Sequence, residues 1–109
     1  MADAYGRMEL SEQRNVRVTL TPVAPTTAIT ISTATVTLYD SGGAVAGSVS
    51  GLTATFDTGS QAAPRVWWLM RPSVLGITAG LYVATFKITD STGFVWEPTV
   101  SVRVVADGS

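Results

Sequence analysis

The chain of 109 residues contains no cysteine and no histidine. Without cysteine it can form neither disulfides nor thiolate metal sites in any compartment. Without histidine it lacks the commonest general base and the commonest neutral metal ligand. A hydrolase made from this chain would need a serine–lysine pair, a carboxylate pair or a bound metal. We therefore expect no enzymatic activity and no cofactor.

Charge is also scarce, because only 14% of the residues are charged and the net charge is −1. Ordinary soluble domains carry about 25% charged residues. Seven basic residues against eight acidic ones lack the excess that predicts nucleic-acid binding. A surface poor in charge suits contact with other protein. We expect an oligomer or a multi-copy component of an assembly, with a stable threonine- and serine-rich module as the alternative.

Long apolar runs are missing as well. The longest, Val66 to Met70, is far shorter than the ~20 residues that cross a bilayer. The first ten residues lack the apolar stretch of a signal peptide. The sequence therefore predicts that the protein does not associate with a membrane. It also predicts that the protein is made in a cytoplasm.

What the chain does have is β-branched residues, sixteen threonines and fourteen valines, which suit a pleated sheet. Apolar and polar residues alternate over 16–21, 34–39 and 100–104, as in half-buried antiparallel strands. We expect strands near 14–22, 28–39, 44–49, 52–57, 65–71, 81–89 and 94–105, separated by glycine-rich turns and by a crossing segment over 73–80. The pattern predicts an all-β fold, an immunoglobulin-like β-sandwich of about seven antiparallel strands, with a small barrel as the alternative.

Residues 1–13 differ from the rest because they are mixed in polarity. We interpret them as a short N-terminal arm and residues 14–106 as a single sandwich domain. The arm is either frayed in the isolated molecule or ordered on a neighbouring protein. Met8 and Leu10 are the apolar residues through which it would make that contact.

Outside the arm, the candidate interface residues are Trp67, Leu69 and Trp96. Trp67 and Trp68 are adjacent on an expected strand, so they point to opposite faces, and the sequence leaves open which one is buried. Trp67 shares its face with Leu69, and tryptophan is enriched at binding hot spots. Trp96 precedes Pro98, which cannot donate to a ladder and predicts a bulge or an edge in the last strand.

Candidate chemistry beyond these residues is sparse. Asp40, Asp57, Asp90 and Asp107 fall at the ends of expected strands, where aspartate is ordinary turn chemistry. A calcium site is the functional alternative, but no Asp-x-Asp spacing supports it, and we predict no metal site. Lys87 is expected on the solvated face of its strand.

Two segments resemble small immunoglobulin-like domains of tailed-bacteriophage virion proteins, including those that open baseplate upper proteins. The first is a strand with an Asp-x-x-Gly turn, Ala34 to Gly43. The second is Ile77 to Asp90, with the pattern Gly-x-Tyr-x-x-x-Phe-x-Ile-x-Asp from Gly80 onward, followed by a hairpin at Ser91-Thr92-Gly93. The resemblance implies a non-enzymatic structural protein of the virion: a capsid decoration or head-fibre protein, a connector, or a tail or baseplate adaptor. Its partners would be capsid, portal or tail subunits.

The alternative function is a carbohydrate- or ligand-binding sandwich of a bacterial or phage adhesin, with Trp67 or Trp96 as a stacking platform. Sugar sites combine an aromatic ring with several polar side chains, and the chain has a single asparagine, Asn15. We therefore favour the virion protein.

Overall fold

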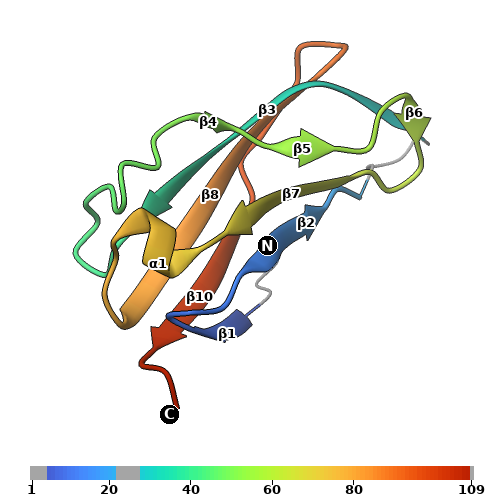
Figure 1. Cartoon of the computed structure of the whole chain (residues 1–109). Coiled ribbons are helices and arrows are strands. Elements are labelled where there is room, and N and C mark those ends of the chain that lie inside the picture. The colour runs from blue at the N-terminus through green and yellow to red at the C-terminus, as the bar shows by residue number, and fades with distance from the viewer. Residues whose placement is uncertain (1–4, 22–27, 109) are drawn as a thin grey trace.

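The structure is a computed structural model that describes residues 5–21 and 28–108. These residues form two facing layers of strands (Figure 1). The elements are, in chain order, β1 (Tyr5–Glu9), β2 (Arg14–Thr19), β3 (Ile29–Tyr39), β4 (Leu52–Thr53), β5 (Thr55–Phe56), β6 (Ser60–Gln61), β7 (Arg65–Met70), α1 (Pro72–Leu75), β8 (Gly80–Asp90), β9 (Val95–Trp96) and β10 (Thr99–Val105).

The two layers are a larger and a smaller sheet. The larger sheet has the order β1-β10-β8-β3-β4, with β6 added to β3 and β9 added to β8. The smaller sheet has the order β2-β7-β5. Every pairing is antiparallel except β1 with β10, which is parallel. The predicted all-β, immunoglobulin-like sandwich is confirmed, and one edge of it departs from the antiparallel rule.

The core lies between the sheets and follows the alternation seen in the sequence. Val16 and Val18 of β2 belong to one core cluster with alternate residues of β8 and β10, while their neighbours on each strand are more exposed. The fully buried side chains from the long strands are Val36, Leu38, Ala84, Phe86 and Ile88. Threonine occupies most outward positions of β3, because a β-branched hydroxyl residue fits a solvated pleated face, whereas the outward positions of β8 are mixed.

The structure contradicts the prediction of a separate N-terminal arm over those residues of 1–13 that it describes. Residues 5–9 form β1, which pairs with β10 from Ser101 to Val105. Met8 is only 2% exposed and belongs to the core, and Leu10 packs against that core. The Leu10 N–H also donates to the carbonyl of Val105 at 3.0 Å. The sandwich therefore begins before residue 14, and residues 1–4 of the predicted arm lie outside the described residues.

The region 40–57 differs from the two strands expected there. Residues 44–49 form a turn that meets β3 through an isolated bridge between Tyr39 and Val45 and through a bond from the Leu38 N–H to the Val49 carbonyl at 3.0 Å. Gly47 and Ser48 adopt left-handed φ angles of 61° and 58°, which a continuous strand does not accommodate. The expected strand over 52–57 is split at Ala54. Residues before it pair with β3 and residues after it pair with β7, so the chain changes sheet at this point.

The crossing segment over 73–80 contains one helical turn. Pro72 opens α1, where its fixed φ suits the first helical turn. Gly76 ends the helix at φ 71°, and its N–H donates to the carbonyl of Pro72. A single turn is too short to produce a helical period in the sequence.

Pro98 interrupts the last strand without a bulge. β9 and β10 keep one register against β8, with Trp96 opposite Ile88 and Thr99 opposite Thr85. The Phe86 N–H donates to the Pro98 carbonyl at 2.9 Å. Proline has no N–H that could donate to the Phe86 carbonyl in return. The ladder therefore lacks one hydrogen bond at Pro98, but its register is unchanged.

Candidate functional site

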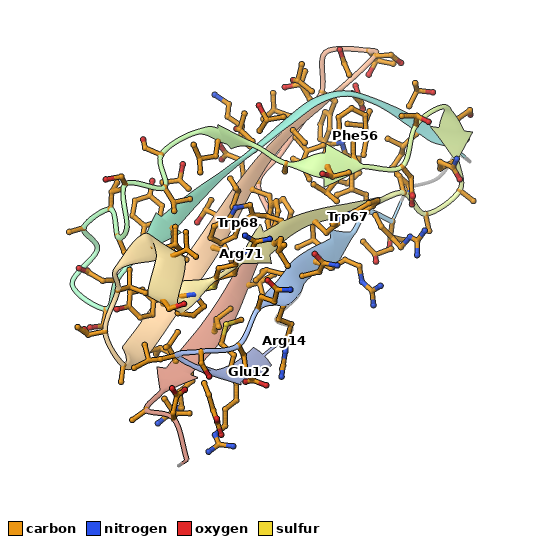
Figure 2. All side chains as sticks on the ribbon, viewed as in Figure 1. Glu12, Arg14, Phe56, Trp67, Trp68 and Arg71 are labelled. Carbon is orange, nitrogen blue, oxygen red and sulfur yellow. The ribbon has the colours of Figure 1, made fainter. Side chains whose placement is uncertain are left out.

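The burial of side chains along β7 shows which of the adjacent tryptophans, Trp67 or Trp68, faces the core. Val66 and Met70 of β7 are fully buried, and Trp68 packs against the core between them. Trp67 and Leu69 therefore lie on the opposite face, which is turned away from the larger sheet. Figure 2 labels Trp67 and Trp68 on this strand. Leu69 is 39% exposed there. The inner tryptophan is Trp68, and the outer one is Trp67.

Two arginines border Trp67. Arg17 of β2 lies directly across the strand pair from Trp67, and Thr55 of β5 lies across from it on the other side. The guanidinium carbon of Arg65 is 5.9 Å from the centroid of the Trp67 ring, within the range of a cation–π contact. We call Arg17, Arg65, Trp67 and Leu69 the Trp67 platform.

Asp57 fixes one side of this platform. Arg65 donates from Nε to Oδ2 of Asp57 at 2.9 Å and from its second guanidinium nitrogen to Oδ1 at 3.2 Å. The backbone N–H of Arg65 also donates to Oδ2, at 3.0 Å. These bonds, above all those from the Arg65 side chain, lower the pKa of Asp57. The arginine is thereby held in one position beside the tryptophan.

The charges around the smaller sheet are unequal. Asp57 forms an ion pair with Arg65. The carboxylate oxygen of the exposed Glu12 lies 3.7 Å from a guanidinium nitrogen of Arg14. Arg17 and Arg71 make no ion pair within the described parts of the chain. Among these described residues the arginines therefore outnumber the carboxylates by two, although the chain as a whole has a net charge of −1.

Trp96 lies elsewhere, on the larger sheet. It is half-buried opposite Ile88 and packs against the core, so it does not join the Trp67 platform. Its Nε1 is buried and makes no hydrogen bond of good geometry. The indole does face Asp90 and makes the smallest of the contributions that lower the pKa of that carboxyl.

The exposed aromatic beside Trp96 is Phe94, which the sequence interpretation missed. Phe94 is 59% exposed and meets the Trp96 ring edge-on, with the ring centroids 5.1 Å apart. Asp90 holds the turn by accepting bonds from the N–H groups of Thr92 and Phe94 and from the Thr92 hydroxyl, which is the chief cause of the lowered Asp90 pKa. The signal was the position of Phe94 directly after the turn residue Gly93.

The remaining predicted residues are placed as follows. Met8 is in the core and Leu10 is partly buried against it, so neither presents an apolar surface to a partner in this structure. Asp40 accepts bonds from the N–H groups of Gly42 and Ala44, which is turn chemistry as expected. Lys87 is exposed on the outer face of the larger sheet.

The chemical possibilities at these positions are those of binding. Within residues 5–21 and 28–108, no group of three or more carboxylates is arranged to hold a metal ion. Over the same residues, no helix has the length and apolar character needed to cross a membrane. The Trp67 platform supplies an aromatic face, an aliphatic side chain and two guanidinium groups, which together can take up a partner with apolar and anionic groups.

Comparisons with known proteins identify the fold and no family. No protein-family model matches the chain, and no curated protein matches it. Among solved structures it is similar to the periplasmic chaperone SfaE, with a TM-score of 0.58 and 7% identity over 97% of this chain. It is also similar to a family 123 glycoside hydrolase from Clostridium perfringens, with a TM-score of 0.51 and 10% identity over 94% of this chain. The chain spans 55% of the chaperone and 23% of the hydrolase, and at these identities the likeness is one of fold alone.

Proposed function

We propose that this chain is a non-enzymatic accessory protein of a tailed-phage virion, made in the host cytoplasm and incorporated in many copies. It binds other virion subunits, such as capsid, portal or tail proteins, through the Trp67 platform. The observation that carries the proposal is the position of Trp67, which lies on the outer face of the smaller sheet beside the exposed Leu69. A tryptophan flanked by arginine is the composition of an interface hot spot.

Two further features support an assembly role. The segments Ala34 to Gly43 and Ile77 to Asp90 resemble virion immunoglobulin-like domains, and each contains residues of a long strand of the larger sheet, β3 or β8. The outward residues of β3 are mostly threonine, which is easily desolvated compared with charged side chains. A module that repeats in many copies needs only modest affinity at each contact.

The test is a pull-down from the native source, with a tag on Ser109 and identification of bound proteins by mass spectrometry. The wild-type chain is expected to recover a capsid, portal or tail protein. Trp67→Ala is expected to weaken that binding by roughly 2–4 kcal/mol, whereas Phe94→Ala, on the other sheet, leaves it unchanged. Recovery of no virion protein by the wild-type chain would contradict the proposal.

A second candidate function is ligand binding at the same platform. The Trp67 ring has Arg65 beside it and Asp57 behind that arginine, an aromatic face next to hydrogen-bonding groups. Such a pairing suits a sugar ring stacked on the indole. A reproducible hit on a glycan array that is lost in Trp67→Ala, together with a pull-down free of virion proteins, would favour this candidate over the first.

A further inference from the structure

The strand β2 has a free edge. β2 pairs with β7, and no other described strand pairs with it. It is six residues long, the longest of the described strands that pair with a single neighbour, since β1 has five residues and β4, β5, β6 and β9 have two each. In Figure 1 it forms the border of the smaller sheet on the side away from β5. A free edge of this length is a template for an added strand.

The register identifies which backbone groups face outward from this edge. The Leu20 N–H donates to the Pro64 carbonyl at 2.9 Å, in the same register that pairs Val18 with Val66. In an antiparallel ladder the backbone groups of alternate residues point toward the same neighbour. Val16 and Val18 therefore direct their N–H and C=O groups at β7. Asn15, Arg17 and Thr19 direct theirs away from it, toward the free edge.

The charge at this edge indicates what it would accept. Arg17 lies on the outer face next to Trp67 and has no ion pair among the described residues. Arg14 shares only an exposed contact with Glu12. β2 itself contains two arginines and no acidic residue. An incoming strand with a carboxylate opposite Arg17 would gain a charge-assisted hydrogen bond. A strand with a basic residue at that position would be repelled by the Arg17 guanidinium.

A second copy of this chain fits the edge poorly. In the symmetric antiparallel register centred on Arg17, where Asn15 pairs with Thr19 of the other copy, Arg17 lies directly opposite Arg17 of the other copy. Like charges directly opposite each other destabilise a strand pair. The occupant favoured by the edge is therefore a segment of a different protein.

We propose that β2 receives an extended, acidic segment of a partner protein as a fourth strand of the smaller sheet. The segment alternates acidic and apolar residues. Its acidic side chains lie on the outer face opposite Arg17, which separates them from Trp67 on β7, and its apolar side chains continue the inner face of β2. This inference rests on the proposed function, because it specifies the chemistry of the partner that the Trp67 platform would meet.

The test uses synthetic peptides and amide NMR of the full chain. The probe is acetyl-Val-Glu-Val-Glu-Val-Glu-Val-amide. Its matched controls replace each glutamate by lysine, or carry N-methyl groups at alternate residues. The acidic peptide is expected to slow hydrogen exchange at the amides of Asn15, Arg17 and Thr19, while the already bonded amides of Val16 and Val18 change little. The lysine peptide, and the N-methylated peptide whose methyl groups face β2, are expected not to bind.

Two pairs of variants separate the backbone contact from the charge contact. Thr19→Pro removes an edge N–H that makes no bond to β7, and it should weaken binding of the acidic peptide about fivefold or more. The matched variant Thr19→Ala keeps that N–H and should change peptide binding less than about twofold. Arg17→Glu should reverse the preference between the acidic and lysine peptides, and Arg17→Lys should preserve it. Thermal unfolding of each variant shows that it remains folded.

Several results would overturn the proposal: no binding of the acidic peptide, equal binding of every N-methylated form, or equal binding of oligothymidylate, which would indicate general attraction of polyanions. A dimer whose protection maps to the same three amides would also overturn it. If virion proteins are recovered in a Trp67-dependent way but the peptide does not bind, this inference fails and the proposed function stands. If the peptide binds and no virion protein is recovered, the reverse holds.

Discussion

Asp57 and Arg65 form a bidentate ion pair in which the same carboxylate also accepts the backbone N–H of Arg65. The Asp57 N–H in turn donates to the Arg65 carbonyl at 3.0 Å, so side chains and backbone connect the two residues at the end of β5 and the start of β7. Because Arg65 also lies 5.9 Å from the Trp67 ring centroid, this pair determines how one side of the platform is presented.

The first prediction concerns pH. The pKa of Asp57 in the folded chain is below its ordinary value of 3.8, chiefly because of the Arg65 side chain. Its contribution to stability is therefore fully present above about pH 4 and is lost as the pH falls through the lowered pKa. Thermal unfolding measured from neutral to acidic pH should show a smaller acid-induced drop in Tm for Asp57→Asn than for the wild-type chain.

Asp90 provides the comparison for that experiment, because its pKa is lowered by the Thr92 hydroxyl and no arginine is involved. Asp90→Asn should also reduce the acid-induced drop, and high salt should affect the Asp57 contribution more than the Asp90 contribution. An acid-induced drop in Asp57→Asn as large as in the wild-type chain would contradict the assigned role of the ion pair.

The second prediction separates the adjacent tryptophans by stability. Trp68 packs against the core, so Trp68→Ala should lower the free energy of unfolding by about 3 kcal/mol. Trp67 lies on the outer face, and Trp67→Ala should lower it by less than about 1 kcal/mol, chiefly through the lost contact with Arg65. Urea unfolding followed by circular dichroism measures both. A larger loss for Trp67→Ala than for Trp68→Ala would mean that the faces are reversed.

The third prediction tests whether the N-terminal segment is part of the sandwich. Met8 is 2% exposed, and Met8→Ala should cost about 2–5 kcal/mol of stability. Gln13→Ala, at an exposed position of the same segment, should be neutral within about 0.5 kcal/mol. Equal stability of the two variants in chemical denaturation would restore the interpretation of residues 1–13 as an arm.

The fold could be predicted because burial in half-covered strands imposes a period of two, which Val16 and Val18 or Val100 and Val102 show without help from distant residues. The orientation of Trp67 and Trp68 could not, since both parities of β7 are apolar. Only the pairing with β2 and β5 decides which side faces the larger sheet.

Other misses have the same cause. The stretch from Leu52 to Phe56 looks continuous in the sequence, but its two halves pair with strands of different sheets. β1 lacks a clear alternation because its position depends on parallel bonds to β10, about a hundred residues away in the chain. Long-range pairing of this kind leaves no local signal in the sequence.

The last prediction concerns the turn that replaces the expected strand over 44–49. Gly47 has a φ of 61°, and a Cβ built there would lie 3.0 Å from the Cβ of Leu75 and 3.2 Å from Cγ2 of Ile77. Gly51 has a similar φ of 63°, but a Cβ there would meet nothing within 4 Å. Both alanine variants pay about 1 kcal/mol for the left-handed backbone.

Gly47→Ala should lose a further 1–3 kcal/mol or so, because Leu75 at the end of α1 and Ile77 after it must move to accept the methyl group. The difference between the two variants in urea unfolding therefore measures how tightly the turn packs against the α1 segment. Equal losses of unfolding free energy for Gly47→Ala and Gly51→Ala would show that the α1 segment shifts to accept the methyl group without loss of stability. The close approach of Gly47 to Leu75 would then play no part in holding the helix at this end of the sandwich.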